Sequence, residues 1–92
     1  MKYVVVTVFD RAAGAYSRPA YVGAVGLAVR SFQDEVNRDA PDNELFKHPD
    51  DFDLYHLGHW DDVGGTFELF EKPKKLAYAG ELKMGVRLAA KH

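Results

Sequence analysis

The 92-residue sequence contains no cysteine, which excludes a disulfide framework and thiolate metal ligands. It has no apolar run near the ~20 residues that a membrane-spanning helix needs. The apolar segment at residues 3–9 is too short and too rich in β-branched residues to be a signal peptide. Hydrophobic residues make up 47% of the chain, which allows a thin core. We therefore expect one intracellular domain that does not enter a membrane.

Features of catalytic sites are also scarce. Serine occurs only at Ser17 and Ser31. Gly23 and Gly26 lack the third glycine, the preceding parallel strand and the lysine of a phosphate-binding loop. Carboxylates are plentiful, but acids at turn positions usually form a solvated surface, and a domain this small rarely encloses a substrate pocket. We therefore expect no enzymatic activity, no cofactor and no small-molecule substrate.

Four histidines raise the question of a metal site. His56 and His59 are three residues apart and would share a metal on a helix, but a strand would point them to opposite faces. His48 precedes a proline and two aspartates, a pattern that is typical of a loop entering a strand. Together with His92, these residues do not predict a metal site.

Charge is strongly segregated along the chain, although the net charge is only −2. Residues 1–30 hold four basic residues and one acidic residue, residues 31–70 hold two basic and eleven acidic residues, and residues 71–92 hold six basic and two acidic residues. A polyanion would be attracted to both ends of the chain and repelled by its middle. Binding of a polyanion therefore depends on whether the fold brings the two basic ends together.

The first half of the chain predicts two strands and a helix. Residues 3–9 are β-branched and aromatic, which favours a strand, and residues 15–22 continue as an edge or bulged strand because they contain Pro19. An apolar stripe with helical spacing then predicts a helix over residues 24–38, which ends before Pro41.

The second half predicts a hairpin. Residues 52–60 and 66–70 favour strands, and the five residues between them are rich in turn formers. The complete prediction is an α+β fold of ββαββ order, with an antiparallel sheet of about four strands and one helix packed on one face. We expect a single domain over residues 1–76 and a partly ordered basic C-terminal tail over residues 77–92.

One helix would leave the other face of the sheet open. Large exposed apolar patches usually bind protein partners. We therefore predict a homo-oligomer interface on this face, while a DNA-binding platform and an ordinary core stay open as alternatives. The residues of the predicted interface are Tyr3, Val5, Thr7 and Phe9.

Several segments occur in an order that resembles a known family. The most specific is residues 47–62, with a His-Pro-acid-Asp-aromatic start, a Leu-Gly step and an aromatic-Asp-Asp turn. The chain resembles the small nonstructural protein of gokushovirus-type microviruses, which are phages with single-stranded DNA genomes. The other matching segments are Val8-Phe9-Asp10, Ala13-Gly14-Ala15-Tyr16, Arg18-Pro19-Ala20-Tyr21, Ala28-Val29-Arg30-Ser31-Phe32 and Val36-Asn37, followed by Pro73 and Leu76.

This resemblance implies a function. Members of that family are described as DNA-binding or replication-associated proteins. We therefore expect a phage protein that binds single-stranded DNA without strong sequence preference, during genome replication or the switch to single-strand synthesis. The expected location is the cytoplasm of the infected bacterial host, and the expected assembly is a homodimer or a higher homo-oligomer. The alternatives are an adaptor that binds replication proteins through the acidic middle of the chain, and a scaffold in virion assembly.

Single-strand binding needs cations for phosphates and flat side chains for bases. The predicted nucleic-acid-binding tyrosines are Tyr16, Tyr21 and Tyr78. The predicted cations are Arg11, Arg18, Lys72, Lys74, Lys75, Lys83, Arg87 and Lys91.

Overall fold

Five antiparallel strands form a single sheet in a computed structural model that describes residues 1–84. The strand order is β2-β1-β4-β5, and β3 pairs with the same edge of β1 as β2. The predicted α+β class and antiparallel sheet are confirmed. The elements are β1 (Lys2–Asp10), β2 (Ala15–Tyr16), β3 (Ala20–Val22), α1 (Val25–Val36), α2 (Glu44–Lys47), η1 (Pro49–Asp51), β4 (Phe52–Asp61), β5 (Thr66–Tyr78) and α3 (Ala79–Leu82).

The element order differs from the predicted ββαββ because the second strand is broken in two. Residues 17–19 separate β2 from β3, and Pro19 lacks the N–H group that a continuous ladder needs. Ser17 replaces part of the ladder, since its hydroxyl accepts from the Val8 N–H at 3.1 Å and its carbonyl accepts from the Thr7 hydroxyl at 2.8 Å. The chain therefore stays along β1 across the break.

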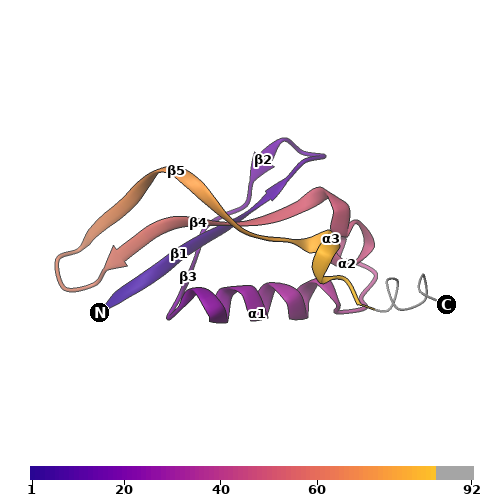
Figure 1. Ribbon diagram of the computed structural model, residues 1–92, viewed down its shortest axis with the longest axis horizontal. Coiled ribbons are helices and arrows are strands. Elements are labelled where there is room, and N and C mark those ends of the chain that lie inside the picture. The colour runs from indigo at the N-terminus through magenta and orange to yellow at the C-terminus, as the bar shows by residue number, and fades with distance from the viewer. Residues whose placement is uncertain (85–92) are drawn as a thin grey trace.

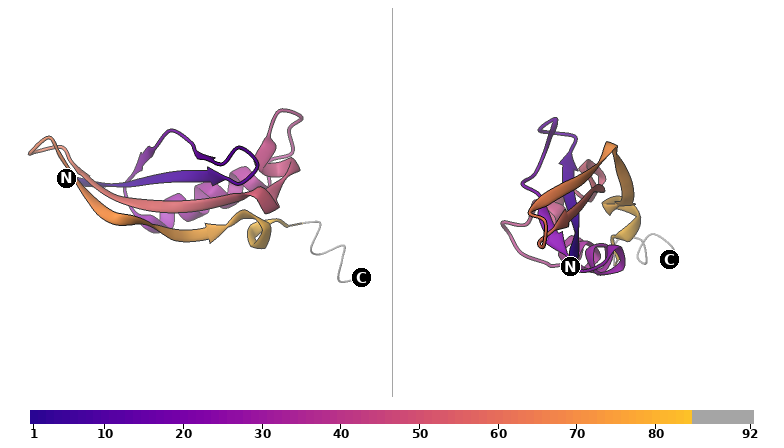
Figure 2. Two further views of the ribbon diagram at one scale, coloured as in Figure 1. Left: turned by 90° about the horizontal axis from the view of Figure 1, so that it is seen from above. Right: turned by 90° about the vertical axis from the view of Figure 1, so that its left-hand side faces the viewer.

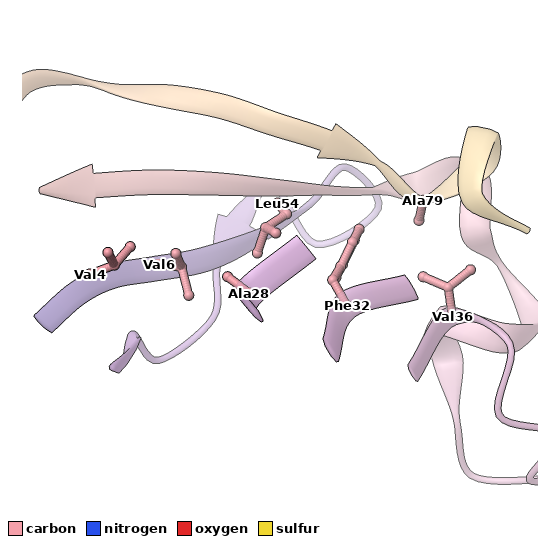
Figure 3. Close-up of a cluster of buried hydrophobic side chains, with 7 residues drawn as sticks. All are labelled: Val4, Val6, Ala28, Phe32, Val36, Leu54 and Ala79. Atoms are coloured by element: carbon pink, nitrogen blue, oxygen red, sulfur yellow. The ribbon is translucent and has the colours of Figure 1, made fainter. Parts of the chain in front are cut away.

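The core lies between α1 and one face of the sheet (Figure 3). Ala28, Phe32 and Val36 form the buried stripe of α1, at the four-residue spacing of one helix face. They pack with Val4 and Val6 of β1, and with Leu54 and Ala79. Figures 1 and 2 show α1 along one side of the sheet, while the helices α2, η1 and α3 gather near the end where α1 finishes.

The folded domain extends past the predicted boundary at residue 76. β5 continues through Pro73, which an edge strand tolerates, and Ala79 of α3 is completely buried in the core. Residues 77–84 thus belong to the domain, although the prediction assigned them to the tail. The rest of the predicted tail, with Arg87 and Lys91, lies outside the described residues. No helix in the described chain is long and apolar enough to span a bilayer.

A bulge at Gly58 changes which side chains share a face. The pairing of β1 with β4 shifts between Val5–Gly58 and Val6–His56, so Leu57 is an extra residue. Gly58 has φ of 144°, and a Cβ there would collide with the Glu68 carbonyl of β5. Because of the extra residue, the rings of His56 and His59 lie on the same face, with centroids 5.2 Å apart. The prediction that they point to opposite faces is wrong.

Candidate nucleic-acid interface

The sheet face opposite α1, called here the open face, carries most of the aromatic side chains. Directly paired residues of neighbouring strands point to the same face. Tyr3 pairs with Trp60, which pairs with Phe67, and Phe9 pairs with Tyr16. By this register, the aromatic residues of the open face are Tyr3, Phe9, Tyr16, Tyr21, Tyr55, Trp60, Phe67 and Tyr78.

A first aromatic group lies where β1 begins and the β4–β5 hairpin turns. Tyr3, Tyr21 and Trp60 line an open pocket of about 230 Å³, and the rings of Trp60 and Phe67 are 4.8 Å apart. Tyr21 is 49% exposed and Phe67 is 51% exposed. These rings are held by the sheet on one side and reach solvent on the other. They can therefore stack on a flat ligand.

A second aromatic group lies where β1 ends and β2 begins. The ring of Tyr16 is 4.8 Å from that of Phe9 and 5.7 Å from that of Tyr55. Tyr16 is 50% exposed, so its outer ring surface stays accessible. Within the described residues, no aromatic ring contact joins this group to the first.

Three of the predicted binding residues meet beside the second group, but they serve the fold. Arg11 donates from Nη2 to Asp53 at 2.7 Å and from Nη1 to the Asp50 carbonyl at 2.8 Å. Lys75 lies 3.2 Å from the other oxygen of Asp53, whose side chain is only 4% exposed. Tyr78 donates to the Asp50 carboxylate at 2.9 Å, and this hydrogen bond raises the pKa of Tyr78. The network ties η1 to the turn after β1, to β4 and to β5.

The remaining predicted cations differ in their availability. Arg18 is exposed in the loop between β2 and β3 and makes no ion pair within the described chain. Lys72 is exposed on β5, in the stretch of residues 70–73 that does not pair with β4. Lys74 pairs with His56 and therefore lies on the α1 side, where its Nζ is 4.0 Å from the centroid of the Phe70 ring.

Lys83 is not available to phosphate. It is only 7% exposed, donates to the Phe46 carbonyl at 2.9 Å and lies 3.1 Å above the centre of the Phe46 ring. Burial lowers the pKa of Lys83. The structure corrects the prediction for this residue, because its ammonium group holds the segment after α3 against α2.

The predicted oligomer interface is only partly accessible. Val5 and Thr7 are 2% and 3% exposed within the single chain, and the Thr7 hydroxyl is already hydrogen-bonded to the Ser17 carbonyl. Tyr3 and Phe9 are half-buried. The oligomer stays a prediction, and on this face its contacts would come from the aromatic residues rather than from Val5 or Thr7.

Acidic residues largely avoid the open face. Among the acids paired in the strand ladders, Asp10, Asp61 and Glu68 lie on the α1 side and only Asp53 lies on the open face. Glu68 is paired with Lys2 at 2.8 Å. Asp61 accepts from the N–H groups of the β4–β5 turn, which lowers its pKa. Of the acids in the strand ladders, the open face therefore carries only Asp53, which is neutralised by Arg11 and Lys75, and the carboxylate of Asp50 in η1 meets this face at Tyr78.

No metal centre is visible in residues 1–84, where no three histidines or carboxylates gather as ligands. His56 is buried, and its Nε2 bonds to the Gly58 carbonyl at 3.0 Å. Its ring packs edge-on to Phe70 at 4.7 Å.

Sequence reasoning missed Tyr55, Trp60 and Phe67. The signal for two of them was present, because Trp60 and Phe67 flank the predicted turn and would face each other in a hairpin. Tyr55 reaches the face only through the register that the Gly58 bulge sets.

Comparison with known proteins gave one match. The model of the family described as phage ORF5 protein matches residues 3–82 of the chain. No curated protein and no solved structure matches it.

Proposed function

The chain belongs to the phage ORF5 protein family, and from this premise we propose that it is a phage nonstructural protein that binds single-stranded DNA with little sequence preference. It would act in the cytoplasm of the infected bacterium, during genome replication or the switch to single-strand synthesis. The resemblance to the gokushovirus nonstructural protein supports this role. The proposal requires no cofactor and no catalysis.

The open face is the observation that carries the proposal. It presents Tyr16, Tyr21 and Phe67 at about half of their full exposure, on a rigid sheet. Stacking of bases on aromatic side chains contributes roughly 1–3 kcal/mol per base and tolerates any sequence. Such a face suits unpaired bases, because the bases of a duplex are already stacked on one another.

Charge supports the same ligand. Arg18 and Lys72 are exposed without an ion-pair partner in the described chain, while Arg11 and Lys75 neutralise the carboxylate of Asp53. In the acid-rich segment from residue 31 to residue 51, α1 lies on the opposite side of the sheet from the open face, while η1 reaches the open face where Asp50 accepts a hydrogen bond from Tyr78. A polyanion can therefore approach the first aromatic group without meeting the acids of α1.

Fluorescence polarisation with a labelled single-stranded oligonucleotide tests the proposal. Affinity should fall steeply as salt concentration rises, because each phosphate contact releases counterions. Arg18→Ala should weaken binding to all sequences and reduce the slope of log affinity against log salt by about 1. Arg30→Ala is the matched control, since Arg30 is an exposed arginine on α1, and it should leave the slope unchanged.

The absence of binding at low salt would contradict the proposal. A protein that does not bind oligonucleotides but associates with replication proteins would instead be an adaptor. The acidic surface of α1 and α2 would then be its binding surface. Light scattering in the same buffers measures whether the protein is a homodimer or a higher homo-oligomer.

A further inference from the structure

We infer that the open face binds a single DNA strand in a stretched form, with the strand along β1 and one base on each row of the sheet. A row is a set of directly paired residues on neighbouring strands. This inference rests on the proposed function and specifies how many nucleotides one chain contacts and in which conformation.

Every row that β1 contributes to the open face contains an aromatic ring. Rows 1 to 4 are named here by the residues of β1 that face this way, which are Tyr3, Val5, Thr7 and Phe9. Rows 1 and 4 have a ring on β1 itself. In row 2 the ring is Tyr21 of β3, which pairs with Val5, and in row 3 it is Tyr55 of β4, which pairs with Thr7. The rings therefore follow β1 without an empty row.

The rings of the four rows are accessible from solvent. Tyr21 in row 2 is 49% exposed and Tyr16, which pairs with Phe9 in row 4, is 50% exposed. Tyr55 in row 3 and Trp60 in row 1 are half-buried. All four lie on strands that are direct neighbours of β1, and neighbouring strands are about 4.8 Å apart. A strand of DNA that runs along β1 can therefore reach each of them.

The spacing of the rows determines the conformation of the bound strand. Rows on one face of a strand recur every two residues, or about 6.6–6.8 Å, whereas nucleotides of a duplex strand recur every ~3.4 Å. A strand with one base on each row is therefore stretched to about twice the duplex rise. Its bases are then too far apart to stack on one another, and each stacks on a ring of the protein.

The length of the site follows from the same rows. Rows 1 and 4 are six residues apart on β1, which corresponds to roughly 20 Å. Figure 1 shows the start of β1 beside the β4–β5 turn and β2 toward the other end of the sheet. Four rows accommodate four nucleotides, at the lower end of the ~4–16 nucleotides of known single-strand-binding domains.

Arg18 supplies a cation beside this path. The preceding residue, Ser17, is attached to the end of β1 that carries rows 3 and 4, because its carbonyl accepts from the Thr7 hydroxyl at 2.8 Å and its hydroxyl accepts from the Val8 N–H at 3.1 Å. Arg18 itself is exposed. It is therefore placed to contact a phosphate between stacked bases.

A length series tests the number of bases in the site. Polarisation of labelled oligothymidylates of about 2 to 8 nucleotides covers the expected four. Affinity should rise by about fivefold or more for each added base up to four, since a stacked base contributes at least ~1 kcal/mol. It should rise only slightly for longer strands.

The stretched form has its own measurement. Pulsed electron paramagnetic resonance gives the distance between nitroxide labels on the first and fourth nucleotides of a four-residue oligoadenylate. This distance should increase from about 10 Å in the stacked free strand to roughly 20 Å in the complex. Adenines stack on one another more strongly than thymines, so the protein should bind an oligothymidylate more tightly than an oligoadenylate of equal length.

Variants of row 2 test the role of the rings. Tyr21→Ala should weaken binding of the four-residue oligothymidylate by about fivefold or more, and Tyr21→Phe, which keeps the ring, should restore it. Leu69→Ala is the matched control, because Leu69 is 61% exposed and lies in the same row through Gly58 but has no ring. It should reduce affinity less than Tyr21→Ala does. Circular dichroism checks that each variant is folded.

A label distance that stays near about 10 Å in the complex, equal affinity for the two homopolymers, or a steep rise of affinity well beyond four nucleotides would overturn the stretched arrangement while leaving DNA binding in place. If the unmodified protein binds no oligonucleotide of any length, the proposed function itself is wrong.

Discussion

The two faces of the sheet are built from different side chains. The core under α1 is mainly aliphatic, with Val4, Val6 and Leu54 packed on Phe32 and all four at most 7% exposed. The open face is aromatic, and Tyr16 and Tyr21 keep about half of their surface in solvent. Aliphatic side chains can fill the space between two layers because they have no polar atoms that need hydrogen-bond partners. Tyrosine can pack one side of its ring on the sheet and leave the other side and its hydroxyl in water.

This difference indicates that folding and binding depend on separate residues. Burial against α1 stabilises the domain, while rings left half exposed on a rigid sheet contribute little to stability and remain available to a ligand. The predictions below test that separation, from the largest expected effect to the smallest.

Phe32→Ala should be the most destabilising of these substitutions. Phe32 is the largest side chain of the buried core cluster (Figure 3), and truncation of a buried phenylalanine typically costs about 3–5 kcal/mol. That loss approaches the ~5–15 kcal/mol total stability of a small domain. The measurement is urea unfolding followed by circular dichroism.

Tyr16→Ala is the control on the open face, and its unfolding midpoint should stay close to that of the unmodified protein. Comparable losses in the two variants would show that the aromatic face is part of the structural core.

Arg11→Ala should lower the free energy of unfolding by about 2 kcal/mol, since the nearly buried carboxylate of Asp53 loses its closest cation and keeps only Lys75. Arg18→Ala, which breaks no ion pair in the described chain, should change stability by less than about 0.5 kcal/mol. Thermal unfolding of both variants beside the polarisation assay measures the contrast. An Arg11 variant of normal stability would contradict the structural role of this network.

His56→Gln should have the smallest effect, confined to acidic pH. Burial lowers the pKa of His56, and repulsion by His59 and Lys74 lowers it further. The hydrogen bond to the Gly58 carbonyl acts in the opposite direction but is the weaker cause. The unfolded chain, with a histidine pKa near ~6.5, takes up the proton more readily than the folded chain. This contribution to stability is therefore complete above about pH 6.5 and is lost as the pH falls below it.

Unfolding midpoints measured from about pH 7.5 to pH 5 should accordingly fall less in His56→Gln than in the unmodified protein. His48→Gln serves as the control, because His48 is exposed at the end of α2. The unfolding midpoint of this variant should change with pH as steeply as that of the unmodified protein. Identical slopes for all three proteins would show that His56 does not contribute to the acid response.

Local patterns were sufficient to predict several elements. The helix predicted over residues 24–38 is α1 at Val25–Val36, and the strand predicted over residues 3–9 lies within β1. Both patterns express the periodicity of an element with one buried face. The length of β5 could not be predicted in this way, because Pro73 breaks a local strand pattern but is accommodated at the edge of a sheet.

The candidate site was only partly predictable. Tyr16, Tyr21 and Arg18 were identified from residue type, and the structure leaves all three exposed on the first hairpin. Lys74 and Lys75 are adjacent in sequence but lie on opposite faces, and Lys83 is buried against Phe46. A cation-rich segment therefore did not form a single cationic surface.

The amino-acid sequence by itself determined the class of the fold, the amphipathic helix and the separation of acidic from basic segments, because these properties depend on neighbours along the chain. Tertiary structure alone decided which rings share the open face and which cations stay free. The extra residue Leu57 in the bulge at Gly58 and the break at residues 17–19 set the register, and register determines the face of every later side chain.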